Sequence, residues 1–390
     1  MTFPERFSNL PPYAFPRLRS LLAGLEPGGE PVDMTIGSPL HPFPQWITDI
    51  IVENAAGFGG YPPNDGAPEL LSAISDWILF RYNVKVDAAT QVLSLNGTRE
   101  GLFNSAMALC PEGKNGKPVV LMPNPFYQVY SVASLAVGAE PIYVPATLDT
   151  GFLPDFASMP EDVLNRTAIA YLCSPSNPQG AVASPEYWAD LLALAEKYDF
   201  KIFADECYSE IYRGVVPTGA LTAAKGHDPE RVVLFNSLSK RSNLAGLRSG
   251  FAASGPENIK HMKALRAYAG APLPLPLQRA AEKLWGDEGH VEANRVLYRE
   301  KLDYSDTLFG EIDGFKSPEA GFFLWLPVKN GEEATKRLWT QEGVKVLPGA
   351  YLGRDYQGTN PGDQYIRVAL VAPMNELQPG LIRLKSCIYG

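Results

Sequence analysis

One lysine of this 390-residue chain follows an apolar run and has potential phosphate donors on both sides. The run RVVLFNS (231–237) continues as LSKRSNLAGLRSG, which brings Ser237, Ser239, Lys240 and Arg248 close together in sequence. A lysine amine can form an imine with an aldehyde cofactor, while serine and arginine side chains can donate hydrogen bonds to a phosphate. Taken alone, Lys240 is more simply explained as a solvated loop residue, because lysines rarely leave water.

A carboxylate and a phenol follow another apolar run. KIFAD (201–205) leads into ECYSEIY, so Asp205 and Tyr208 are close in sequence. A carboxylate could keep a pyridine nitrogen protonated, which makes the ring an electron sink, and the Tyr208 hydroxyl could reach the phenolic oxygen of that ring. The simpler explanations are an aspartate that caps a turn or helix and a tyrosine buried in the core.

Two further runs end in residues that suit the same planar ring. AIAYLC (168–173) is followed by SPSNPQG, in which the Asn177 amide could donate to the phenolic oxygen and lower the pKa of the imine. PVVLM (118–122) is followed by PNPFYQVY, which places Tyr127 where its ring could stack on a cofactor. An ordinary Asn-Pro turn and a core aromatic are the alternatives.

A fifth site could bind an anion. QVLSL (91–95) is followed by NGTREGLFNSAMAL, in which Gly97 provides a bend and Thr98 and Arg99 open a helix. The exposed N–H groups and the dipole at a helix N-terminus attract a phosphate. Simple helix capping by Thr98 or Asn96 would give the same pattern.

The strands of one sheet would bring these five sites together. Apolar runs alternate with helical patterns, which is typical of an α/β fold whose large domain has a mostly parallel sheet between helices. Ligands of such sheets bind beyond the carboxyl ends of the strands, where all five sites lie. Each signal is weak alone, but the combination favours a cofactor site over five unrelated structural roles. The expected strands cover residues 91–95, 118–122, 168–173, 201–205, 231–237 and 249–254.

The chain divides into three regions. Residues 1–45 are rich in proline and glycine and predict an N-terminal arm, with a short helix near 17–23, that supplies part of a small domain. Residues 46–275 form the expected large cofactor-binding domain, and the proline cluster APLPLPLQ marks its boundary. Residues 276–390 form the expected small C-terminal α/β domain. Its elements are a helix at about 287–310 and strands at 321–328 and 364–371.

Composition and charge exclude several classes of function. With a net charge of -9, the chain lacks the clustered basic residues that nucleic-acid binding needs. The start MTFPERFSNL has no signal-peptide pattern and no apolar run is long enough to span a membrane, so we expect a cytoplasmic protein. The four cysteines form no CxxC pair, so neither disulfides nor a metal site are expected. A small-molecule substrate is the remaining expectation.

From Gly37 to Arg367, the order of these motifs resembles the class I and II aminotransferases of fold type I. The run SLSKRSNLAGLRSGF is close to a signature of that family. The resemblance implies pyridoxal 5′-phosphate as the cofactor, with Lys240 as its Schiff-base lysine and proton shuttle. It also implies that Asp205 contacts the pyridine nitrogen.

The same resemblance implies roles for the other site residues. Asn177 and Tyr208 would contact the phenolic oxygen, and Tyr127 would stack on the ring. The residues implied around the phosphate are Gly97, Thr98, Arg99, Ser237, Ser239 and Arg248.

Substrate and partner contacts are implied as well. Tyr61, in GGYPPNDG, is similar to the family tyrosine that reaches the phosphate of the neighbouring subunit, which implies a homodimer with shared active sites. Arg367, in QYIRVALV, would grip the α-carboxylate of the substrate with a planar bidentate fork. Gly37 and Asn177 are expected to contact the amino acid or keto acid beside it.

Within the family, the five motifs look most like N-succinyl-diaminopimelate aminotransferases of lysine biosynthesis. The expected reaction moves an amino group between N-succinyl-LL-2,6-diaminopimelate and 2-oxoglutarate. The alternatives are an aminotransferase for aspartate or another amino acid and a lyase of the same fold. A non-enzymatic cofactor-binding regulator is a third, but we expect no DNA-binding module in the residues before Gly37.

A succinylated substrate would carry a distal carboxylate. That group needs a second cation besides Arg367, because a buried carboxylate without a partner is costly. The sequence does not rank the candidates, which are Arg17, Arg19, Arg99 and Arg241.

Overall fold

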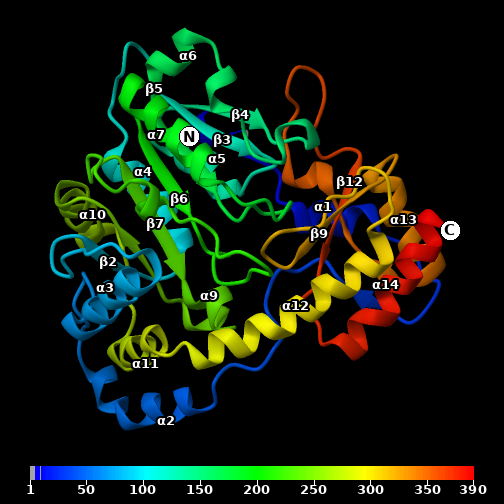
Figure 1. The fold of residues 1–390 in the computed structure, drawn as a ribbon, viewed down its shortest axis with the longest axis horizontal. Coiled ribbons are helices and arrows are strands. Elements are labelled where there is room, and N and C mark those ends of the chain that lie inside the picture. The colour runs from blue at the N-terminus through cyan, green and yellow to red at the C-terminus, as the bar shows by residue number, and fades with distance from the viewer. Residues whose placement is uncertain (1–4, 9) are drawn as a thin grey trace.

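The computed structural model describes residues 5–8 and 10–390, which form a large α/β unit and a smaller unit beside it (Figure 1). The large unit is built on a seven-stranded sheet in the order β2-β8-β7-β6-β5-β3-β4. Strand β8 is antiparallel to β2 and β7, and the other neighbours are parallel. The predicted fold class is therefore confirmed. The strands are β2 (Val92–Leu95), β3 (Val119–Asn124), β4 (Glu140–Pro145), β5 (Thr167–Cys173), β6 (Lys201–Asp205), β7 (Val232–Ser237) and β8 (Gly250–Ala253).

The edge strand β4 was not predicted from the sequence. Its residues, EPIYVP, include two prolines, and only Val144 among them is buried. Proline is tolerated at an edge because one side of the strand makes no ladder hydrogen bonds. The strand therefore lacks the continuous apolar run that marks its buried neighbours.

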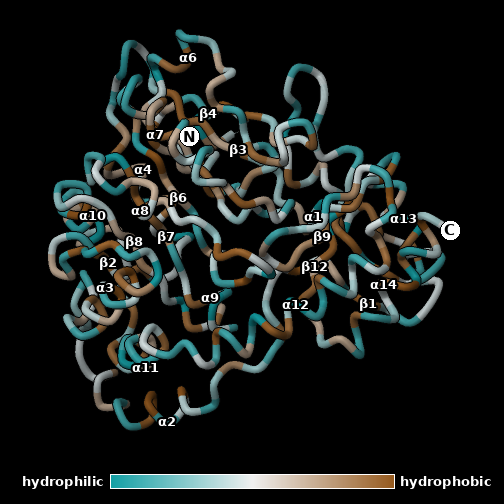
Figure 2. Tube along the Cα trace, viewed as in Figure 1, coloured by the Kyte–Doolittle hydropathy of each residue, from teal (hydrophilic) through white to brown (hydrophobic). Residues whose placement is uncertain are grey.

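Alternate side chains of the central strands enter two different cores. In β3, Val119 and Leu121 join one cluster, while Val120 and Met122 join the other. Helices α3 (Pro68–Tyr82), α7 (Pro185–Tyr198) and α11 (Leu275–Gly286) cover the first face. Helices α4 (Thr98–Leu109), α5 (Gln128–Ala136) and α10 (Pro256–Ala269) cover the second. Figure 2 shows hydrophobic residues along these central strands.

The small unit has its own sheet and core. Strands β9 (Phe323–Pro327), β11 (Leu347–Pro348) and β12 (Tyr365–Ala369) are antiparallel in the order β11-β12-β9. Helices α13 (Gly331–Glu342) and α14 (Met374–Tyr389) pack on them. From the arm, β1 (Val32–Asp33) pairs in parallel with β10 (Val344–Lys345), and α1 (Ala14–Leu21) packs against the small unit.

The long helix α12 (Gly289–Phe309) runs from the large unit to the small one (Figure 1). Just before it, α11 begins within the proline cluster, and its Ala280, Leu284 and Trp285 belong to the core on the large sheet. We therefore propose that the domain boundary lies after α11 rather than at residue 275. Pro276 occupies the first turn of α11, where the missing N–H would have no helical partner.

No helix among the described residues is long and apolar enough to cross a membrane. The described residues contain no group of three or more His, Cys, Asp or Glu side chains placed to hold a metal, and the four cysteines are free thiols.

Short elements complete the described chain. They are η1 (Glu5–Phe7), α2 (Trp46–Glu53), η2 (Ala55–Gly59), η3 (Leu148–Thr150), η4 (Phe156–Ser158), α6 (Glu161–Arg166), α8 (Ala220–Ala223), α9 (Leu238–Arg241), η5 (Ala245–Leu247) and η6 (Gly349–Leu352).

A buried carboxylic acid, Glu206, should make stability depend on pH. Its carboxyl accepts from the Tyr82 hydroxyl at 2.8 Å and from the Ala220 N–H at 2.6 Å, yet burial raises its pKa from 4.5 to about 7. The folded protein thus keeps a proton that the unfolded chain releases. The free energy of unfolding should fall as pH rises from 4.5 to about 7, by up to ~1.4 kcal/mol per pH unit.

Urea unfolding of Glu206→Gln at several pH values in this window measures the effect. The variant should show a flatter pH dependence than the wild type, whereas Glu112→Gln, at an exposed position, should not. Equal pH dependence in the wild type and Glu206→Gln would contradict the assignment.

Candidate active site

A cavity of about 350 Å³ lies at the carboxyl edge of the large sheet, where the small unit faces it. Residues that follow each large-sheet strand with a predicted motif line one side of the cavity. Residues of β12 and of the segment after β1 line the other side. The structure thus brings together residues from most of the chain. The predicted residues that line the cavity are Gly37, Thr98, Arg99, Tyr127, Asn177, Asp205, Tyr208, Ser239, Lys240, Arg248 and Arg367.

Lys240 lies on the short helix α9, directly after β7. Its Nζ donates to the carbonyl oxygen of Gly37. Burial lowers its pKa to about 8, and the positive charges of Arg367 and Arg248 act in the same direction. An amine with such a pKa is partly neutral near physiological pH, which is the form that attacks an aldehyde.

Asp205 ends β6 with a buried carboxylate. The Tyr130 hydroxyl donates to Oδ2 at 2.7 Å, and the Cys207 N–H donates to Oδ1 at 3.3 Å. Burial raises the pKa of Asp205, and no described Lys, Arg or His lies within ion-pair distance of it. A protonated nitrogen in the cavity would supply the missing positive partner.

Donors suited to a phosphate gather where α4 begins. Gly97 has φ +78°, a conformation that favours glycine, and a Cβ there would lie 2.2 Å from a terminal nitrogen of Arg248, so the guanidinium would have to move. Arg248 donates to Ala245 O at 2.8 Å. Ser239 lines the cavity, and Ser237 lies behind it with the two Oγ atoms 2.9 Å apart. Hydroxyl groups, a guanidinium and a helix N-terminus therefore converge on one place.

Arg367, on β12, is a buried guanidinium with unused donors. It donates to Thr35 O at 2.7 Å and to Asn177 Oδ1 at 3.3 Å, and it lies 4.2 Å from the centroid of the Phe323 ring. Its Nε has no hydrogen-bond partner in the described part of the chain. Burial lowers its pKa to about 10. Such a group is suited to bind a carboxylate.

Aromatic residues form another part of the lining. Tyr127 accepts from Arg99 Nε at 2.8 Å, and Tyr208 is buried. Tyr61 is exposed and lies outside the cavity lining of this chain, so its predicted contact with a neighbouring subunit stays a prediction.

Two of the lining residues that sequence reasoning missed contact predicted site residues. Tyr130 is one helical turn after Tyr127 and holds Asp205. Cys207, two residues after Asp205, places its Sγ 3.1 Å from Thr98 Oγ1. The turn-spaced tyrosines were a usable signal for Tyr130, whereas nothing in the sequence distinguished Cys207 from a core thiol.

The structure ranks the four arginines considered for a distal carboxylate. Arg241 has a fully buried side chain that donates to Glu288 and to Leu284 O, away from the cavity. Arg17 lies 3.8 Å from the Tyr351 ring centroid, outside the cavity, and Arg19 does not line it either. Among these four, only Arg99 lines the cavity.

Known proteins resemble the chain over its whole length. The profile of the family "Aminotransferase class I and II" matches residues 30–378. Proteins named LL-diaminopimelate aminotransferase from Dehalococcoides mccartyi and Desulforudis audaxviator are 31% and 32% identical, over 99% and 100% of this chain and 99% of each relative.

Solved structures agree with the sequence matches. An aminotransferase from Neisseria meningitidis has a TM-score of 0.93 and 38% identity, and covers 98% of this chain and 99% of its own. The aminotransferase AspB from Helicobacter pylori has a TM-score of 0.90 and 33% identity over 99% of both chains. The chain therefore belongs to the class I and II aminotransferases, and it is a pyridoxal-phosphate-dependent transaminase.

Proposed function

We propose that this transaminase moves an amino group between N-succinyl-LL-2,6-diaminopimelate and 2-oxoglutarate. The charge of the cavity lining carries the proposal. Arg99, Lys240, Arg248 and Arg367 are basic, whereas Asp205 is the sole carboxylate among the described lining residues. N-succinyl-LL-2,6-diaminopimelate carries a carboxylate at each end, a third carboxylate beside its amide and no second ammonium, and such a substrate matches this pattern.

Arg99 is the cation left for the distal carboxylate. Lys240 and Arg248 face the cofactor side of the cavity, and Arg367 suits the α-carboxylate. The hydrogen bond from Arg99 Nε to Tyr127 orients the guanidinium and leaves the donors of its two terminal nitrogens for a ligand. A bidentate contact there would recognise a carboxylate and reject an apolar end.

LL-diaminopimelate itself is a second candidate, because relatives that carry this name match the chain end to end. Its distal carbon carries an ammonium beside the carboxylate. That ammonium would need an acceptor, and Asp205, the sole carboxylate of the described lining, suits the ring nitrogen of the cofactor. The succinylated compound, whose distal nitrogen is a neutral amide, therefore suits the lining better.

The lining also fits the cofactor. Arg248 forms no ion pair with a described carboxylate, and Gly97 leaves room for its guanidinium, which suits an incoming phosphate. Asp205 lacks a cationic partner, which suits a protonated ring nitrogen. We propose that Thr98, Ser237, Ser239 and Arg248 surround the phosphate, whereas Arg99, which the resemblance also places there, is assigned to the distal carboxylate.

When bound, pyridoxal phosphate supplies a ring that accepts the electron pair left on the substrate Cα. Lys240 would hold the cofactor through Nζ and, as a free amine, would take the proton from Cα; its lowered pKa keeps part of the amine neutral for this task. Asp205 would keep a proton on the ring nitrogen. Asn177 and Tyr208 would donate to the phenolic oxygen, while Arg367 would fix the α-carboxylate so that Cα faces Lys240.

We also propose a homodimer with shared active sites. Three apolar side chains that are close together in sequence are exposed: Val52, Phe58 and Tyr61, the last of which is the predicted subunit-bridging tyrosine. A surface of this kind is typical of an interface between subunits. Sedimentation of the holoenzyme would measure the oligomeric state.

Lys240→Ala should lower kcat by about 10⁴-fold while leaving the fold intact, because the general base is lost but the phosphate donors remain. Borohydride treatment of the wild type followed by peptide mapping should place the cofactor on Lys240. Lys260→Ala, at an exposed lysine, is the matched control. A label on another lysine would overturn the assignment.

Asp205→Asn should lower kcat on the order of a hundredfold or more with a smaller change in cofactor affinity, because the phosphate contacts stay while the ring loses its protonating partner. Cofactor affinity is measured by absorbance titration of the apoenzyme, and kcat by steady-state kinetics. Near-normal turnover in this variant would remove Asp205 from the mechanism.

Arg99→Ala should lower kcat/KM for N-succinyl-LL-2,6-diaminopimelate by roughly ten- to a hundredfold, the loss expected for a hydrogen-bonded charge pair. The half-reaction with norleucine, an amino acid with an apolar side chain, should change little. Equal losses with both substrates would show that Arg99 acts on the cofactor instead. A higher wild-type kcat/KM for LL-diaminopimelate or aspartate would refute the succinylated substrate.

A further inference from the structure

The segment between β1 and α2 supplies two main-chain carbonyls to the cations of the cavity. Thr35 O accepts from the Arg367 guanidinium at 2.7 Å, and Gly37 O accepts from Lys240 Nζ. A Cβ on Gly37 would come within 2.4 Å of the Phe323 ring, so the chain lies directly on β9 there. The position of this segment therefore affects where both cations point.

Side chains hold the second half of this segment. Met34 still forms main-chain hydrogen bonds, to Lys345 and Ala369, at 2.9 and 2.8 Å. Residues 36–42 form no hydrogen bond between main-chain atoms within the described chain. Their hydrogen bonds are instead with the side chains of Lys240, Lys301 and Asn243.

Lys301, on α12, is a buried lysine that the proposed mechanism does not use. Its side chain is held in an almost fully buried position, with the residue only 1% exposed. Instead of a carboxylate, Nζ has two neutral partners: His41 Nε2 at 2.7 Å and Leu370 O at 2.9 Å. The His41 ring also packs edge-on against Tyr298, with the ring centroids 5.1 Å apart.

The protonation states of His41 and Lys301 favour a hydrogen bond that Lys301 donates and His41 accepts. Burial lowers the pKa of His41 to about 4, and the charge of Lys301 acts in the same direction. Burial lowers the pKa of Lys301 to about 7, against the opposing effect of Glu300. His41 is therefore neutral at physiological pH, and its Nε2 can accept from Lys301.

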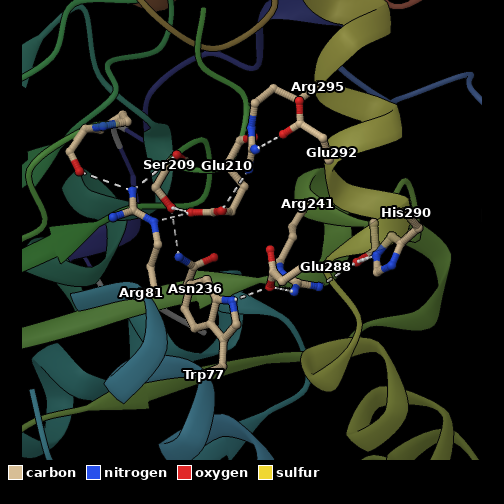
Figure 3. Close-up of polar contacts among 12 residues, drawn as sticks. Trp77, Arg81, Ser209, Glu210, Asn236, Arg241, Glu288, His290, Glu292 and Arg295 are labelled. Carbon is tan, nitrogen blue, oxygen red and sulfur yellow. Dashed lines mark hydrogen bonds and ion pairs between the residues drawn. The ribbon is translucent and has the colours of Figure 1, made fainter. Parts of the chain in front are cut away.

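Helix α12 gives this lysine a fixed position. Figure 3 shows Glu210, in the loop after β6, between Arg81 and Arg295 of α12, at 2.7 and 3.3 Å. At the start of α12, Glu288 pairs with Arg241 of α9. The helix that carries the buried lysine is thus attached to the loop after β6, which carries Tyr208, and to α9, which carries Lys240.

We propose that His41 and Lys301 are positioning residues, which hold the segment after β1 so that its carbonyls orient Arg367 and Lys240. Neither side chain lines the cavity, so they act through the main chain of residues 35–37. The inference rests on the proposed roles of Arg367 and Lys240.

His41→Leu removes the acceptor and keeps an apolar side chain, whereas His41→Gln keeps an amide oxygen that can accept from Lys301. In the holoenzyme, His41→Leu should raise the KM for L-glutamate about tenfold with kcat changed less than about threefold, because Arg367 binds the carboxylate in both ground and transition states. His41→Gln should recover most of the loss. His261→Leu, at an exposed histidine, should match the wild type.

The pH titration of cofactor absorbance without substrate gives a second readout. In His41→Leu, displacement of the Gly37 carbonyl that accepts from Lys240 disfavours the protonated form of the Lys240 nitrogen, so the midpoint should move to lower pH. A double-mutant cycle with Lys301→Met should show that the double variant is no worse than the worse single variant.

Three results would overturn the proposal: an unchanged KM and midpoint in His41→Leu, equal defects in His41→Leu and His41→Gln, or additive effects in the cycle. If wild-type enzyme fails to react with L-glutamate, the proposed use of 2-oxoglutarate as the amino acceptor is wrong. The absorbance titration, which needs no substrate, then tests the proposed role of His41 and Lys301 by itself.

Discussion

An unpaired positive charge on the small-unit side of the cavity constrains the whole site. Arg367 is buried on β12, and its described partners, a main-chain oxygen, an amide oxygen and an aromatic ring, are all neutral. Removing a guanidinium from water without a counter-ion is costly, so the site favours a ligand that brings the anion. Burial is the main cause of the lowered pKa of the neighbouring Lys240, and the charge of Arg367 acts in the same direction.

The convergence of the proposed cofactor residues on one cavity could be predicted from the sequence because of how parallel sheets are built. Apolar runs such as those before Asn177, Asp205 and Lys240 mark buried strands, and the residues after such strands meet at one edge. No pairing between distant residues had to be known. The resemblance to a family supplied the chemical roles, which local patterns alone left open.

The rest depended on contacts that local patterns do not encode. Arg99 and Arg241 were equivalent in sequence, yet one lines the cavity and the other is buried against Glu288. His41 and Lys301 are 260 residues apart and meet only through the path of the arm over α12. The edge strand β4 and the packing of α11 were missed for a related reason: exposure and tertiary contacts, rather than periodicity, decided them.

Tyr13, Ala14 and Phe15 of the N-terminal arm line the cavity, and this has an evolutionary consequence. These arm residues belong to a segment that packs on the small unit and contributes no proposed contact to the coenzyme. Substitutions there can reshape the space around a substrate side chain while the inherited coenzyme chemistry stays intact. Duplicated genes for this scaffold can therefore diverge in the amino acid they accept through a handful of changes near the N-terminus, and directed-evolution libraries for new amine products are best focused there.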